Sequence, residues 1–143
     1  MSRPRRAYES GEPVTLLVRL ARIGYLVSIL LLLVGIFAEV FFAGEIMLVS
    51  ASAIIQHREL GGWLSLVPIL ILVMAFLSRL SRRMLVWSGV PAVLYSLQYL
   101  FLYGIDNLRL PLDLKALHAV NALVMFWVAQ YLARIAWKLL RPL

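Results

Sequence analysis

The sequence predicts an all-α membrane protein: a bundle of four transmembrane helices with the N and C termini in the cytoplasm. First, 63% of the 143 residues are hydrophobic and the mean hydropathy is +0.91, whereas a soluble domain is closer to half apolar. Second, the apolar residues form four long runs, at about 23–49, 58–78, 84–104 and 116–137. Third, the basic residues gather at alternate ends of these runs. A lipid bilayer is therefore the expected environment of the chain and its first predicted partner.

Each run is close to or above the ~20 residues that a helix needs to cross a ~30 Å hydrocarbon core. The runs are continuously apolar, which is not the alternating pattern of membrane strands, and helices satisfy their own backbone groups in lipid. The first run is too long for a secretory signal peptide and is followed by no small-residue cleavage site. We expect residues 1–12 to form a flexible cytoplasmic tail and residues 13–143 to form the transmembrane domain.

The orientation follows from the 14 lysines and arginines. Only Arg58, Arg109 and Lys115 fall on one side of the predicted membrane. The remainder fall on the other side, and these are Arg3, Arg5, Arg6, Arg19, Arg22, Arg79, Arg82, Arg83, Arg134, Lys138 and Arg141. Because positive residues concentrate in cytoplasmic loops, this second side is predicted to be the cytoplasm. The same positions argue against nucleic acid as a partner, since no basic face with interleaved aromatic residues is visible.

The chain contains two histidines and no cysteine. The lack of cysteine excludes disulfides, thiolate metal sites, iron–sulfur clusters and cysteine nucleophiles. His57 and His118 stand at the outer ends of the second and fourth apolar runs, in "AIIQHRELGGWLSL" and "DLKALHAVNALVMF". Both runs cross the membrane in the same direction, so the two imidazoles are predicted to lie at one depth.

Paired imidazoles from two helices are the usual way to hold a b-type haem in a bundle. Small residues one turn from each histidine leave room for the porphyrin, and these are Gly61, Gly62 and Ala122. The three outer cations, Arg58, Arg109 and Lys115, lie where haem propionates would need partners. The competing interpretation is that both histidines are interfacial residues. A zinc ion is less favoured because it needs three or four ligands, and only Glu45, Glu59 or Asp113 are near enough to join.

Three polar residues inside the apolar runs are further candidates. Asn121 lies one turn from His118, where it would either orient a ligand or bond to another helix. Gln98 is expected to form an interhelical hydrogen bond. Glu39 is costly within a membrane helix and is therefore a functional candidate. Its partner is left open among an arginine, Gln98 or Asn121 bonded to a protonated carboxyl, and a proton path beside a redox centre.

The motifs "FFAG", "HRELG" and "LHAVNAL" resemble those of a family of small bacterial four-helix membrane proteins of unknown function. The second and third motifs also resemble one half of a heme A synthase, in which a four-helix unit carries a haem-ligating histidine on its second and fourth helices. The resemblance implies that His57 and His118 are axial ligands of a haem, and that the chain lies in a bacterial cytoplasmic membrane. Because Ile54 stands where the synthase has a glutamate, it implies a single-haem protein rather than heme A synthesis.

These observations predict a b-type cytochrome with one haem b near the outer face, held by His57 and His118. It would exchange electrons with quinone or a partner redox subunit, and would be a carrier or complex subunit, or a homo-oligomer, more than a stand-alone enzyme. The alternative is a haemless accessory subunit of a larger membrane complex. A small transporter is less favoured, because we expect the second and fourth helices to be unbroken.

Overall fold

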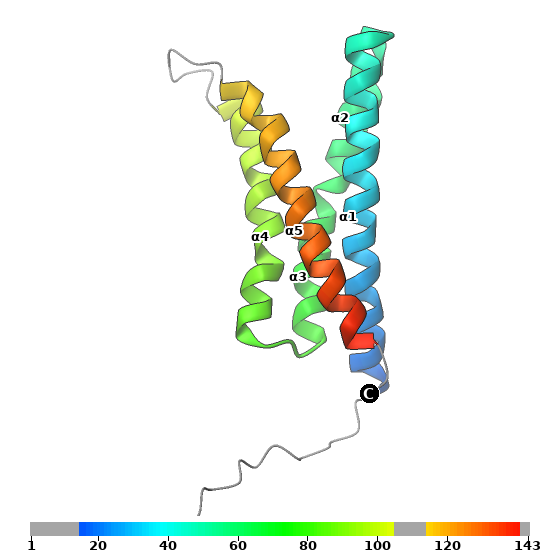
Figure 1. The fold of residues 1–143 in the computed structure, drawn as a ribbon, viewed down its shortest axis with the longest axis vertical. Helices are drawn as coiled ribbons and strands as arrows, with labels where there is room; N and C mark the ends of the chain where they lie inside the picture. The colour runs from blue at the N-terminus through cyan, green and yellow to red at the C-terminus, as the bar shows by residue number, and fades with distance from the viewer. Residues whose placement is uncertain (1–14, 105–113, 141–143) are drawn as a thin grey trace, which may run out of the picture.

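The computed structural model describes residues 15–104 and 114–140, and every regular element in these ranges is helical (Figure 1). The α-helices in chain order are α1 (Leu16–Leu48), α2 (Ile54–Leu64), α3 (Leu66–Leu77), α4 (Arg82–Tyr99) and α5 (Leu117–Leu140). Short 3₁₀ turns precede α2 and α5, namely η1 (Ala51–Ala53) and η3 (Leu114–Ala116). A π-helical turn, η2 (Leu100–Gly104), extends α4.

Four helical segments are long and apolar enough to cross a membrane: Leu16–Leu48, Ala51–Leu77, Arg82–Gly104 and Leu114–Leu140. The predicted fold class is therefore confirmed. The first helix begins at Leu16, earlier than the predicted start near residue 23, because Thr15 caps it by accepting a hydrogen bond from the Val18 amide (3.4 Å). The tail predicted at residues 1–12 lies outside the described residues.

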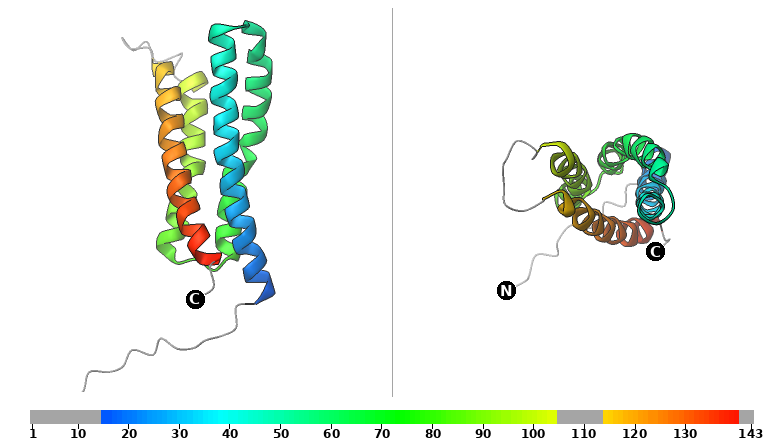
Figure 2. Two further views of the ribbon diagram at one scale, coloured as in Figure 1. Left: turned by 45° about the vertical axis from the view of Figure 1, so that its right-hand side comes forward. Right: turned by 90° about the horizontal axis from the view of Figure 1, so that it is seen from above.

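The four spans form a ring in which α1 packs on α3 and α5, α3 packs on α4, and α4 packs on α5 (Figure 2). α1 begins and α5 ends at the same end of the bundle. The described basic residues separate between the two ends as the sequence predicts. Arg58 and Lys115 belong to the end that carries η1 and η3, and the opposite end carries Arg19, Arg22, Arg79, Arg82, Arg83, Arg134 and Lys138. Which end faces the cytoplasm stays a prediction.

The buried core occupies the middle of the bundle and extends toward the end away from the histidines. Its fully buried members include Tyr25, Ile29 and Leu32 of α1, with Ile71 of α3 and Leu132 of α5. The Tyr25 hydroxyl lies 2.7 Å from Ser88 Oγ, so the one phenol in this apolar layer has a partner on α4. This layer holds α1, α3, α4 and α5 together and leaves the end that carries the histidines to be closed by different side chains.

The second span is interrupted at one residue, Ser65, which keeps helical backbone angles, so the span still runs as one helical segment from Ala51 to Leu77. α2 ends at Leu64, Ser65 forms a turn, and α3 begins at Leu66. Pro68 explains the interruption, because it has no N–H to donate to the Leu64 carbonyl and its ring crowds that carbonyl. Beyond the interruption α2 packs on α1, but no Cα atom of α2 lies within 8 Å of one in α4 or α5. The backbones of α2 and α5 are thus separated by a gap, filled by side chains, at the end that carries the histidines.

Candidate functional site

The imidazoles of His57 and His118 meet across this gap. His57 lies in the first turn of α2, and His118 is the second residue of α5. Their ring centres are 6.3 Å apart and the ring planes are inclined at 75°. Both side chains are partly buried, and the Nδ1 atom of each is fully shielded from solvent. The two predicted ligands are therefore brought together, although the backbones that carry them do not touch.

Glu39 of α1 is the third member of the cluster. Its Oε2 atom lies 2.5 Å from Nδ1 of His57, with side-chain exposures of 18% for Glu39 and 21% for His57. Sequence reasoning missed this pair, since it considered arginine, Gln98 and Asn121 as partners of Glu39. A signal was present: Glu39 and His57 are equally far along the chain from Leu48, where α1 ends. In an antiparallel helical hairpin, residues equidistant from the turn lie at one depth.

Neither Gln98 nor Asn121 is the partner of Glu39. Asn121 is buried and its Nδ2 donates a 2.7 Å hydrogen bond to the backbone carbonyl of Leu94 in α4. Gln98 is also buried, its backbone lies beside the imidazole of His118, and its Oε1 accepts no hydrogen bond from the described residues. Asn121 thus makes the interhelical bond that we considered for it, while the interhelical bond that we expected of Gln98 is not made by its Oε1 atom among the described residues.

The two glycines behind His57 face different surroundings. A Cβ atom on Gly61 would lie 3.3 Å from Oε1 of Glu39 and 3.9 Å from the Tyr95 hydroxyl, which donates a hydrogen bond to the Gly61 carbonyl. A Cβ atom on Gly62 would meet no atom within 4 Å. Gly61 therefore leaves room for the Glu39 carboxyl. The clearance for a porphyrin that we expected from Gly61, Gly62 and the partly buried Ala122 stays a prediction.

Two of the three predicted cations can be placed. Arg58 follows His57 in α2 and is exposed, and Lys115 lies in η3, just before His118, and is also exposed. Both therefore belong to the end of the bundle that carries the histidines. Arg109 and Asp113 lie outside the described residues.

The spacing of the two imidazoles has a chemical meaning. An imidazole nitrogen binds a transition metal at about 2 Å, and the ring centre lies about 1 Å beyond that nitrogen. Two imidazoles on opposite sides of one metal ion therefore have ring centres about 6 Å apart, and the observed distance is 6.3 Å. The rotation of each ring about its metal bond is not fixed by coordination, so the 75° inclination is compatible with it. The spacing is therefore compatible with two imidazoles that share one metal ion.

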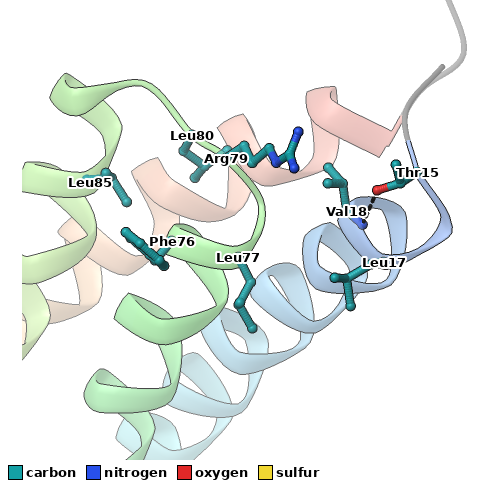
Figure 3. Close-up of a pocket in the computed structure, with 8 residues that line it drawn as sticks. All are labelled: Thr15, Leu17, Val18, Phe76, Leu77, Arg79, Leu80 and Leu85. Atoms are coloured by element: carbon teal, nitrogen blue, oxygen red, sulfur yellow. Dashed lines mark hydrogen bonds between the residues drawn. The ribbon is translucent and has the colours of Figure 1, made fainter. Parts of the chain in front are cut away.

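A groove at the other end of the bundle contains none of these residues. It has a volume of about 480 Å³ and is lined by eight residues from the start of α1, the end of α3 and the turn into α4, among them Thr15, Phe76 and Arg79 (Figure 3). Arg79 adopts a left-handed backbone conformation (φ 53°) in that turn. The groove and the histidine cluster lie at opposite ends of the spans, so they are separate features.

Residues 39–104 match the model of a family of unknown function, DUF6220. This range includes Glu39, His57, Gly61 and Gln98 and ends before His118. No curated protein and no solved structure matches the chain. The expected likeness to a family of unknown function is thus supported over these residues, and the resemblance to a heme A synthase has no support from the comparisons.

Proposed function

We propose that this protein is a membrane b-type cytochrome that holds one haem b between His57 and His118 and exchanges electrons with quinone or a partner redox subunit. The observation that carries the proposal is the 6.3 Å between the two ring centres, contributed by histidines from helices whose backbones do not touch. This spacing is the one expected of two imidazoles that share one metal ion.

The donor set suits a porphyrin iron. The porphyrin supplies four nitrogens, so the iron takes only two ligands from the protein, and neutral imidazoles are common axial ligands. The haem, when bound, supplies one-electron redox chemistry. His57 and His118 would hold the haem from both sides, which would leave no coordination position for a substrate. The chemistry that suits such a site is therefore outer-sphere electron transfer.

The surrounding side chains have defined tasks in this proposal. Arg58 and Lys115 are exposed cations at the right end of the bundle to pair with propionates, and Arg109 is proposed to join them. Asn121 ties α5 to α4 through Leu94 and so fixes the start of α5, where His118 lies. Gly61 and Ala122 are small residues one turn from each histidine and keep side-chain volume out of the gap.

The alternative function is a haemless accessory subunit packed in a larger membrane complex. Membership of a complex is also compatible with the haem proposal, since the haem protein could itself be a subunit. A small transporter stays the less favoured alternative, because Ser65 keeps helical backbone angles and the second span is not unwound. The haem proposal is preferred because it assigns a role to the histidine pair, which neither of the other functions requires.

The test is spectroscopic. Protein is purified from membranes after expression with hemin supply, and reduced-minus-oxidised spectra are recorded for the wild type, His57→Ala and His118→Ala. We expect a sharp α-band in the wild type that is lost in both variants. Gln56→Ala is the matched control, because Gln56 is the exposed neighbour of His57 and its loss leaves both ligands in place. A colourless wild type overturns the proposal and leaves the accessory subunit or the transporter.

A further inference from the structure

We propose that Glu39 is a positioning residue that orients His57 for haem ligation and lowers the reduction potential of the haem. The inference rests on the proposed function and adds the role of a carboxyl group that the ligand pair alone does not require. It is carried by the 2.5 Å distance between Oε2 of Glu39 and Nδ1 of His57, which links α1 to α2 at the depth of the histidine pair.

A carboxylate on Nδ1 determines which nitrogen is free. When the Nδ1–H group donates to Glu39, the lone pair of the neutral ring is on Nε2, and this is the atom that can bind a metal. The same contact fixes the rotation of the ring. Ligating histidines commonly donate their second N–H to a carboxylate or a backbone carbonyl for this reason. Glu39 therefore prepares His57 for ligation before any metal is bound.

The carboxylate also changes the electron density on the imidazole of His57 and, through it, the reduction potential of the haem. A hydrogen bond from Nδ1–H to an anionic acceptor increases the electron density on the imidazole and makes it a stronger donor. A stronger donor stabilises the ferric state over the ferrous state, so the reduction potential falls. The two histidines differ in this respect, because the Glu39 carboxylate pairs with His57, whereas His118 lies beside the backbone of Gln98.

The structure holds the Glu39 carboxyl in place from two sides. The hairpin of α1 and α2 sets Glu39 and His57 at one depth, and Gly61 supplies the space beside Oε1, where a Cβ atom would come within 3.3 Å. Oε1 is buried and makes no hydrogen bond to the described residues. Among the described residues, the carboxyl therefore makes its polar contact with His57. This arrangement is expected of a group that acts through a ligand.

The experiment compares Glu39→Gln and Glu39→Ala with the wild type in a spectroelectrochemical titration of the purified haem protein. Glutamine still accepts from Nδ1–H but carries no charge, so we expect it to keep the haem and raise the midpoint potential. A tenfold change in the ratio of ferric to ferrous stability corresponds to about 59 mV for a one-electron couple. Alanine removes the acceptor as well, so we expect a lower haem content per protein in addition.

Glu45→Gln is the matched control, because Glu45 lies on the same helix nearer its end and forms no ion pair with His57. It should leave the midpoint potential at the wild-type value. A haem-loaded Glu39→Gln protein with the wild-type potential overturns this inference and leaves the proposed function intact, whereas a wild type without haem overturns both. If Glu39→Gln does not accumulate, Glu39→Asp replaces it. Its shorter carboxylate should give a smaller rise in potential, and an unchanged potential again overturns the inference.

Discussion

The side-chain amide of Asn121 donates a 2.7 Å hydrogen bond to the backbone carbonyl of Leu94 and so joins α5 to α4 one turn from His118. No Cα atom of α2 lies within 8 Å of one in α4 or α5, and the Tyr95 hydroxyl of α4 reaches α2 by donating a hydrogen bond to the Gly61 carbonyl. The position of His118 is therefore set on the α4 side, while that of His57 is set on the α1 side through Glu39. The histidine pair lies between two helical pairs, (α1, α2) and (α4, α5), that are held together mainly by the buried core.

Replacing Asn121 with leucine should loosen the (α4, α5) pair. The substitution removes a buried interhelical hydrogen bond, whose net contribution is typically about 1 kcal/mol. We expect a lower midpoint in thermal unfolding of the detergent-solubilised protein. We also expect a lower haem content, since the start of α5, which carries His118, is no longer held against α4. Ser96→Ala is the control, because Ser96 is exposed and bonds only to Ala92 of its own helix. Equal midpoints for Asn121→Leu and Ser96→Ala would show that the Asn121 bond does not hold α5.

The glycine pair behind His57 provides a positional test of the Glu39 contact. A leucine at position 61 must enter the space of the Glu39 carboxyl and the Tyr95 hydroxyl, whereas a leucine at position 62 points to open space. Overpacking of this kind costs about 1–3 kcal/mol. Gly61→Leu should therefore lower both the thermal midpoint and the haem content, and Gly62→Leu should change neither by a comparable amount. The same result for both variants would mean that Gly61 does not face Glu39.

Gly35 allows a similar test of the hairpin packing. A Cβ atom on Gly35 would lie 2.2 Å from Cδ2 of Leu64, the last residue of α2, which is buried. One on Gly44 of the same helix would meet no atom within 4 Å. Gly44→Ala should stabilise the helix by about 0.5–1 kcal/mol, the usual gain of alanine over glycine in a helix. Gly35→Ala should instead destabilise the protein, because Leu64 must move. Equal thermal midpoints would contradict the close approach of α1 and Leu64.

The sequence was sufficient for the four spans and for the histidine pair, for different reasons. The spans follow from the length of the apolar runs, which lipid imposes on any helix that crosses it. The histidines could be paired because two spans of equal direction place their starts at one depth. The contact of Glu39 with His57 was missed because it depends on where the hairpin turns, and the sequence shows that point only through the weak signal "LVSASA". The interruption at Ser65 lies three residues before Pro68, whose missing N–H accounts for it.

The sidedness of the bundle can be tested with single cysteines, since the chain has none of its own. The charge distribution predicts that η1 faces outward and that the turn before α4 faces the cytoplasm. Ser52→Cys should therefore react with a membrane-impermeant maleimide in intact cells, and Ser81→Cys should react only after permeabilisation. Both serines are exposed. Ser81 caps α4 through a 3.4 Å bond to the Met84 amide, so its loss should cost about 1 kcal/mol or less and leave the fold in place. The opposite labelling pattern would place the histidine pair at the cytoplasmic face, and electron partners would then have to be sought on that side.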